Sequence, residues 1–476
     1  MKARAFLGRL IQPIDARAPA LFRIAIGVVT AVDFADRLRD AFTFYSSQGL
    51  LAPDAELVNA PLSLLAFGSA PSPARVVCFF IFGFVAITCF TLGYRTRLAT
   101  VATWAIVYAI QLRNRAIGDG GDTLLRVLLF WALFIDLGGR FSLDVIWRRR
   151  PPQATVPGLP VRLLRLQIAL VYLFAGLSKT GASWLNGSAV YYAVQSVDFG
   201  RPFGSWLAAH PTLARVFGFG TLAAELGFAP LVSMPLRWPV FRALGLTLGL
   251  GLHVGIALTM RVGIFSWVLP ASYAIYLSPR WIDALVRRRD AIVPSGDPFS
   301  DSRLPTPVSR STAALWAILG LQMTAVVCQL VLGKDRGNWV PGVYAELAAL
   351  GMSQGWTMFS PEPPKRLNRF SATGTLTDGQ SIDVLAAAAP MLLPAGGVVY
   401  SRWYKYRSDL ARTRHQDLAI FGRYICRRYN DQTSGAKLRR FTLTLYWRDI
   451  PAPGSKATSD WEHANVLEQP CLADSP

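Results

Sequence analysis

Long apolar segments dominate the sequence, and each is close to the length that an α-helix needs to cross the hydrocarbon core of a membrane. Roughly nine such segments of about 20 residues can be recognised. They cover residues 21–38, 76–94, 98–112, 123–139, 161–179, 213–233, 240–260, 262–279 and 312–332. Of the 476 residues, 52% are hydrophobic and only 16% are charged, which excludes an ordinary soluble protein. The pattern predicts an all-α polytopic membrane bundle.

The first apolar segment is the least regular, because Arg23, Asp33, Asp36 and Arg37 interrupt it. Charged side chains are costly in lipid, so we expect part of this helix to face protein or water. A basic stretch precedes the segment, and no small-residue cleavage site follows it. We therefore predict an uncleaved first span rather than a signal peptide.

The basic residues indicate an orientation. The net charge is +20, but the arginines cluster in short loops between apolar segments, which argues against a nucleic-acid partner. With the N-terminus in the cytoplasm, 20 basic residues fall on the cytoplasmic side and 7 on the other. The rule that cytoplasmic loops are positive therefore favours this arrangement. An odd number of spans then places the C-terminus on the outer side.

The last part of the chain, residues 333–476, has shorter apolar runs and more turn signals than the membrane domain at 1–332. Residues 441–447 predict a strand, and 369–385 predict a hairpin around an Asp-Gly turn. A basic helix is expected from Leu410 to Tyr429, and residues 451–476 are expected to be loosely ordered. These features predict a small α+β extramembrane domain.

The five cysteines carry no metal-binding pattern, since no CxxC or Cys/His spacing is present. Three lie in apolar segments and are expected to behave as small hydrophobic residues. Cys426 and Cys471 could pair in an oxidising compartment, although the sequence does not require it. We predict no metal site.

The stretch YLFAGLSKTGASWLNG, at 172–187, is the strongest candidate for a site. Lys179 stands where an apolar segment ends, and Trp184 and Gly187 follow within two helical turns. A lysine in this place either extends its ammonium to the membrane interface or turns inward to a pocket. An inward, desolvated amine would be a candidate base or nucleophile.

Other ionisable residues lie within or beside the predicted spans. Glu225 and His253 each stand mid-span and are either structural groups or parts of a polar site. Asp122 either pairs with Arg126 one helical turn away or, beside two glycines, contributes to a ligand site. Arg261 falls at the outer end of a span. One polar chamber that holds Lys179, Glu225 and His253 would explain these three residues together. The alternative is that each of them has a separate structural role.

Several of these stretches resemble one known family. YLFAGLSKTGASWLNG is similar to the YFxAGxxKxxxxWxxG stretch of the vitamin K-dependent γ-glutamyl carboxylases and of their bacterial relatives, the horizontally transferred transmembrane (HTTM) domain proteins. Further resemblances occur in the same order, from about residue 16 to residue 390. They are RNRAIGDGGDTLLRVLLFW, LHVGIALTMRVGIFSWVLPASYAIYLSPRW and GWTMFSPEPPKR. The resemblance implies a nine-span bundle with an outward-facing extramembrane domain, here in the bacterial inner membrane with a periplasmic C-terminus.

The resemblance also implies a chemistry. The animal enzyme of the family oxidises vitamin K hydroquinone with O2, removes a glutamate γ-proton and adds CO2. Lys179 matches the proposed base of that reaction, and Glu225 and His253 match polar positions, so these three are the expected catalytic residues. Asp122, Trp184, Gly187 and Arg261 are the expected substrate-binding residues.

Two departures from the animal enzymes leave the function open. The functional histidine before the fourth span is absent here, where Asp119 and Asp122 are the nearest polar groups, and the C-terminal part is shorter. One hypothesis is a carboxylase-like membrane enzyme that uses a quinol and a secreted peptide substrate. The other is a non-catalytic protein that binds lipid or quinone, or assists the maturation of a partner. A transporter is less favoured, because the sequence has no matched pair of broken half-helices.

Overall fold

The computed structural model describes residues 12–50, 61–234, 238–286, 310–332, 341–389, 401–412, 415–455 and 459–472. Within them, five helices are long and apolar enough to cross a membrane. These are α2 (Arg17–Leu38), α5 (Pro73–Leu92), α9 (Gly158–Leu177), α13 (Pro211–Ser233) and α14 (Pro239–Thr259). The protein is thus a mostly helical integral membrane protein, and the count of nine spans stays a prediction.

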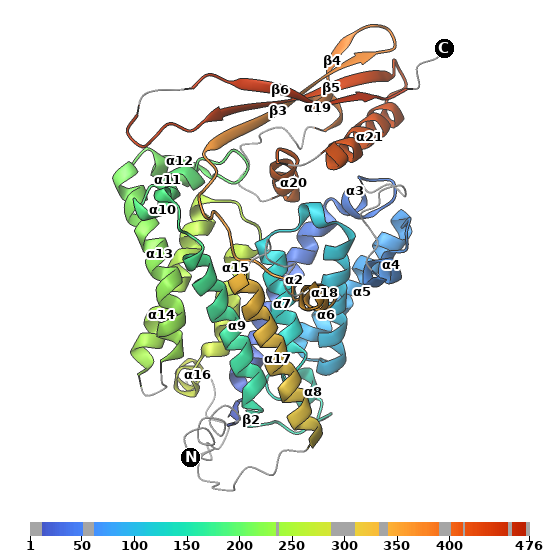
Figure 1. Cartoon of the computed structure of the whole chain (residues 1–476). Helices are drawn as coiled ribbons and strands as arrows, with labels where there is room; N and C mark the ends of the chain where they lie inside the picture. The colour runs from blue at the N-terminus through green and yellow to red at the C-terminus, as the bar shows by residue number, and fades with distance from the viewer. Residues whose placement is uncertain are drawn as a thin grey trace.

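Further helical segments lie beside these five at the other predicted spans (Figure 1). They are α6 (Thr96–Arg113), α7 (Gly120–Ala132), α15 (Phe265–Ser272) with the short 3₁₀ helix η3 (Tyr273–Tyr276), and α17 (Arg310–Leu332). Shorter elements connect them: α3 (Ala41–Tyr45), α4 (Pro61–Phe67), η2 (Arg115–Ile117), α8 (Leu143–Ile146), α10 (Ala182–Leu185), α11 (Ala189–Ala193), α12 (Pro202–Ala208), α16 (Pro279–Val286), α18 (Pro341–Ala349) and the strand pair β1 (Ile14–Asp15) and β2 (Thr155–Val156).

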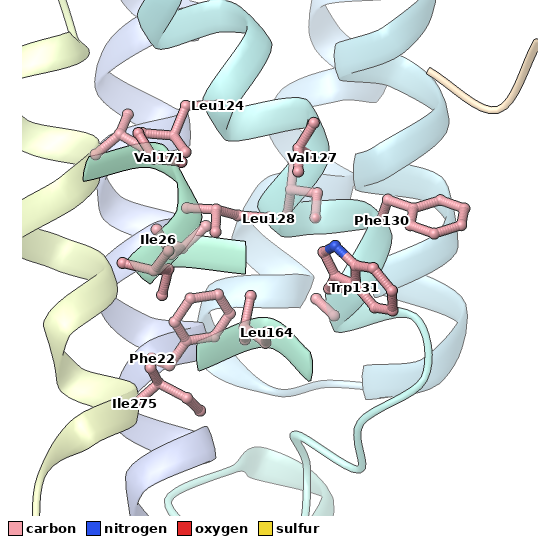
Figure 2. Close-up of a cluster of buried hydrophobic side chains, with 14 of the residues drawn as sticks. Phe22, Ile26, Leu124, Val127, Leu128, Phe130, Trp131, Leu164, Val171 and Ile275 are labelled. Carbon is pink, nitrogen blue, oxygen red and sulfur yellow. The ribbon is translucent and has the colours of Figure 1, made fainter. Parts of the chain in front are cut away.

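Helix α7 lies at the centre of the bundle. Asp119 and Asp122 form a reciprocal capping box at its start, with each carboxylate accepting a hydrogen bond of 3.0 Å from the other residue's backbone N–H. This cap satisfies N–H groups that a helix start leaves without partners. The following residues, Leu124 to Ala132, are almost all buried. Figure 2 shows Leu124, Leu128 and Trp131 of α7 among side chains from α2, α9 and η3.

The irregular first span is explained by its neighbours. Arg23 is fully buried in α2, and its Nη1 donates to the carbonyl oxygen of Leu137 at 2.7 Å, just beyond the end of α7. Asp33 and Arg37 are also buried. The expectation that charged residues of this helix face protein or water is therefore confirmed for these three side chains.

The C-terminal region carries a four-stranded antiparallel sheet in the order β4-β3-β5-β6. Its strands are β3 (Arg366–Leu376), β4 (Ser381–Asp383), β5 (Leu438–Asp449) and β6 (Glu462–Pro470), and its helices are α19 (Val384–Ala388), α20 (Arg402–Leu410) and α21 (His415–Gln432). The sheet lies across one end of the helical bundle, with α20 between the two (Figure 1).

The strand predictions at 369–385 and 441–447 are confirmed by β3, β4 and β5, and Gly379 occupies the hairpin turn with a φ of 84°. The prediction for 451–476 is wrong over β6, which pairs with β5 along its length. The predicted helix from Leu410 to Tyr429 starts later, at His415, because α20 ends at Leu410. The predicted boundary between 332 and 333 borders residues outside the described ranges.

Candidate functional site

A cavity of about 660 Å³ lies between α13, α14 and the C-terminal region. Its apolar walls come from α13, from α14, from the segment between Val190 and Leu207 that includes parts of α11 and α12, and from Phe265 of α15. The segment from Thr357 to Pro364 and α20 also contribute lining residues. This volume is within the range of about 300–1,000 Å³ that is typical of sites for small molecules. The cavity therefore lies where the membrane helices meet the C-terminal region.

Lys179 and Glu225 meet at the wall of this cavity. Lys179 follows the end of α9, and its Nζ donates to Glu225 Oε1 at 2.9 Å and to the carbonyl oxygen of Ala175 at 3.0 Å. Their side chains are 3% and 10% exposed. A buried ammonium and a buried carboxylate each need a partner, and here each is the partner of the other. Lys179 thus turns inward.

Trp184 completes this part of the wall. The Lys179 ammonium lies 5.1 Å from the centre of the Trp184 indole, within range of a cation–π interaction. The indole N–H donates to the carbonyl oxygen of Phe359 at 2.8 Å. Gly181 N–H also donates to Pro361 O at 3.0 Å, which fixes the turn after α9 against the cavity-lining segment.

His253 lies next to the cavity but is not among its lining residues. It is 1% exposed, and its ring packs 5.4 Å from Phe265 and 5.9 Å from Tyr172, measured between ring centres. Neither ring nitrogen has a hydrogen-bond partner among the described residues. Phe265 itself lines the cavity. The imidazole therefore lies behind Phe265, and this side chain separates it from the cavity whose wall includes Lys179 and Glu225.

Three predicted substrate-binding residues lie outside the lining of the cavity. Gly187 has a φ of 79°, and a Cβ there would come within 2.6 Å of the Arg215 side chain, so its role in the described structure is conformational. Arg261 donates to the carbonyl oxygen of Gly200 at 2.7 Å and stacks on Tyr404. Asp122 belongs to a separate ionic cluster. Their part in substrate binding stays a prediction.

The ionic cluster, which consists of Asp33, Arg37, Asp122 and Arg402, joins the membrane helices to the C-terminal region. Arg402 of α20 donates to Asp122 Oδ2 at 2.8 Å and to Asp33 Oδ1 at 2.5 Å. Arg37 donates to Asp33 Oδ2 at 2.8 Å and to Asp122 Oδ1 at 2.5 Å. All four side chains are at most 3% exposed. The charges balance within the cluster, which removes the cost of isolated buried ions.

Of the two alternatives for Asp122, the pair with Arg126 is wrong. Arg126 instead donates to the carbonyl oxygen of Gly351 and to Gln111 Oε1, both at 2.6 Å. The helical spacing allowed a local pair, but Asp122 has two arginine partners from other elements. Burial in a cluster gives more hydrogen bonds than one exposed i,i+4 pair supplies.

Sequence reasoning missed the polar residues at the end of the cavity beside the C-terminal sheet domain, namely Lys405, Ser408, Asp409 and Arg412 of the α20 region. A basic helix was expected nearby, but nothing in its pattern indicates that it covers a membrane cavity. Asp119 also lines the cavity. Burial, together with the negative charge of Asp122, raises the pKa of the Asp119 carboxyl to about 6.

The described residues contain no group of three or more His, Cys, Asp or Glu side chains that could hold a metal ion. What they place together is an ammonium, a carboxylate and an indole at the side of an apolar cavity. Such a pair can bind a hydroxyl group, accept its proton and stabilise the anion that remains.

Residues 11–281 match the HTTM domain family. The chain belongs to this family. It is 24% identical over 269 residues to the sporulation-delaying protein SdpB of Bacillus subtilis (strain 168), covering 55% of this chain and 80% of SdpB. It is 26% identical over 225 residues to the uncharacterized protein YitO of the same organism, covering 45% of this chain and 68% of YitO. No solved structure matches.

The family assignment made from the sequence is thus confirmed. The match includes Lys179, Glu225 and His253 but ends before α17. The cavity-lining segment at 357–364 and α20 lie beyond it. The part of this HTTM protein that covers the cavity is therefore supplied from outside the matched domain.

Proposed function

We propose that this HTTM protein binds a quinol-type membrane amphiphile and that the Lys179–Glu225 pair accepts a proton from its ring hydroxyl. The observation that carries the proposal is the buried ion pair at 2.9 Å on the wall of the cavity, beside the apolar lining from α13 and α14. An apolar ring with a weakly acidic hydroxyl suits both properties of this site. The resemblance to carboxylases that use vitamin K hydroquinone supports the same class of ligand.

The proton transfer balances in charge. The resting pair holds one ammonium and one carboxylate. When a hydroquinone hydroxyl gives up its proton to the pair, the pair gains one positive charge and the ligand becomes a quinolate with one negative charge. The Lys179 ammonium then lies beside this anion, and a low local dielectric strengthens their attraction. Trp184 offers its face to the same ammonium and supports one edge of the site.

We further propose that the site opens towards the periplasm. The cavity lies on the side of the C-terminal region, which the distribution of basic residues places outside the cytoplasm. The described structure joins Cys426 and Cys471 in a disulfide, the kind of bond that persists in oxidising compartments such as the bacterial periplasm. Both arguments support an inner-membrane protein with its N-terminus in the cytoplasm.

The carboxylase-like extension of this proposal is that O2 oxidises the quinolate to a strong base, which removes the γ-proton of a glutamyl side chain of a secreted peptide. CO2 then adds to the carbanion that remains. This extension is supported by the resemblance of 172–187 to the carboxylase stretch. The second candidate is a non-catalytic protein that binds a lipid or quinone, or that assists the maturation of a partner. It is favoured by the fact that Glu225 pairs with Lys179 and balances its charge.

The test uses purified full-length protein in nanodiscs, with menadiol as the probe. We expect menadiol to bind wild type and the control Lys405→Met, whose lysine lines the extramembrane end of the cavity. Lys179→Met should weaken binding at least tenfold. Oxygen uptake above that of empty nanodiscs, lost in Lys179→Met, would favour the enzyme, and binding without uptake would favour the second candidate. Equal binding by wild type and Lys179→Met would overturn the proposal.

A further inference from the structure

The lining of the cavity that carries the ion pair is partly exposed at the side of the helical bundle. Its lining includes Val216 and Phe217 of α13, which are 62% and 42% exposed, and Gly251 of α14, which is also exposed. These two helices are the least buried of the five candidate spans, with 28% and 22% of their apolar stretches covered by protein. They lie together at one side of the bundle (Figure 1). The part of the cavity that is lined by α13 and α14, here called the groove, therefore opens sideways.

At three glycines in the lining of this groove, no side chain fills the space beside the backbone. Gly220, Gly251 and Gly255 line it, and a Cβ added to any of them would meet no heavy atom within 4 Å. Other glycines at this end of the bundle differ. At Gly218, for example, a Cβ would come within 2.5 Å of the carbonyl oxygen of Gly187, so close packing of the backbone explains that residue. The groove glycines therefore border open space rather than a neighbouring helix.

The inner end of the groove is polar. Glu225 is 8% exposed, lines the cavity and directs one oxygen, Oε1, to the Lys179 ammonium. Its other oxygen, Oε2, is 2.9 Å from the same ammonium but accepts no hydrogen bond from the described residues. A buried carboxylate oxygen retains the capacity to accept a further hydrogen bond. A donor on a ligand would satisfy it.

From these observations we infer that the groove between α13 and α14 holds the hydrocarbon tail of a membrane amphiphile whose hydroxyl-bearing head lies at Lys179 and Glu225. The inference rests on the proposed function for the head and adds a separate subsite for the tail. Because the groove opens to lipid, the ligand reaches the ion pair sideways from the bilayer. Gly220, Gly251 and Gly255 keep that route open.

A hydrocarbon chain fits the groove better than a peptide does. A peptide segment lying against apolar side chains at membrane depth would leave its backbone N–H and C=O groups without hydrogen-bond partners, which costs several kcal/mol for each group. The groove lining on α13 and α14 offers few polar side chains, of which Thr221 already donates to the carbonyl oxygen of Phe217 at 2.9 Å. A single acyl or isoprenoid chain has no such requirement.

The experiment compares leucine substitutions on full-length protein in nanodiscs. Gly251→Leu and Gly255→Leu fill the groove without touching the ion pair. Gly227→Leu is the matched control on α13, because Gly227 does not line the cavity and its added Cβ meets only the end of Leu231 at an ordinary 3.7 Å. The probes are a naphthohydroquinone with a four-isoprene tail and its tail-less parent, menadiol. For each probe, the apparent affinity is compared only between protein variants. The partition of the probe into lipid is the same for all variants and does not affect this ratio.

We expect Gly251→Leu to weaken binding of the tailed probe at least tenfold and to leave menadiol binding within about twofold of wild type. Gly227→Leu should bind both probes as wild type does. Equal effects of Gly251→Leu and Gly227→Leu on the tailed probe would overturn the tail subsite. If Lys179→Met changes neither probe while Gly251→Leu still weakens the tailed one, the groove holds the tail and the proposed function of the ion pair is wrong.

Discussion

Arg402 and Asp122 stand 280 residues apart in the sequence and form a buried ion pair of 2.8 Å between α20 and the start of α7. This pair ties the C-terminal region to the most enclosed helix of the bundle. A second link is the pair between Arg407 of α20 and Asp198, at 2.5 Å. Helix α20 is thus held at two points, while its residues Lys405, Ser408 and Asp409 line the cavity.

We expect Arg402→Ala to destabilise the protein by about 3–5 kcal/mol, because it leaves the two buried carboxylates of the described cluster with one arginine, Arg37, in place of two. Denaturation in mixed detergent micelles measures the stability, and tryptic cleavage within α20 reports its release from the bundle. Arg366→Ala is the control, since Arg366 pairs with Asp449 where both side chains are more than 60% exposed. A loss of less than about 1 kcal/mol is expected there. Equal losses in the two variants would contradict the role of the cluster.

Removing one member of the Lys179–Glu225 pair should cost more than removing both. Lys179→Met leaves a buried carboxylate unpaired, with an expected loss of about 3 kcal/mol or more, whereas Lys179→Met combined with Glu225→Leu should recover most of it. The measurement is a double-mutant cycle on unfolding in mixed micelles. Additive losses would show that the two side chains do not interact, in conflict with the contact at 2.9 Å.

The predicted orientation can be tested with the cysteines. We expect Cys426 and Cys471 to resist alkylation until the protein is reduced, because they form a disulfide. A reporter that is active only in the periplasm should be active when it is fused after residue 476, and a reporter that is active only in the cytoplasm should be inactive there. As an internal comparison, a reporter fused within 287–309, a loop predicted to be cytoplasmic, should give the opposite result. A cytoplasmic signal from the C-terminal fusion would reverse the orientation.

Asp119 should make stability depend on pH. Its pKa is raised to about 6, mainly by burial and then by the charge of Asp122, so the folded protein holds this proton more tightly than the unfolded chain does. The contribution of Asp119 to the free energy of unfolding is at most about 3 kcal/mol. It is fully present below about pH 4 and is lost as the pH rises through about 6. Asp119→Asn keeps a good helix cap and should flatten this part of the pH profile. An unchanged profile in Asp119→Asn would exclude Asp119 as its source.

Much of the helical part of the fold could be predicted from the sequence, because each membrane-spanning helix corresponds to one continuous segment of apolar residues. Helices α2, α5, α13 and α14 lie within a few residues of their predicted ranges. Helix α7 is shorter than predicted and ends at Ala132 rather than near 139. Strand β6 was missed because its residues EHANVLEQP lack an alternating apolar pattern, and it is formed by pairing along β5.

Less of the candidate site could be predicted, because its parts come from distant segments. The position of Lys179 at the end of an apolar segment indicated an inward amine as one possibility, and Glu225 is the partner that the structure provides. The partners of Asp122 could not be found by helical spacing, since Arg402 comes from the C-terminal region. The covering of the cavity by α20 has no local signal in the sequence.

The central claim is that the Lys179–Glu225 pair binds the head of a quinol-type lipid. The most direct measurement is a cryo-EM map of the full-length protein in nanodiscs that contain the tailed naphthohydroquinone. We predict density for the ring with its hydroxyl within hydrogen-bond distance of Lys179 Nζ or Glu225, and density for the tail along Gly251. A map in which the bound ring lies elsewhere, or in which the ion pair is unchanged and the cavity holds no ligand at saturating probe, would contradict the claim.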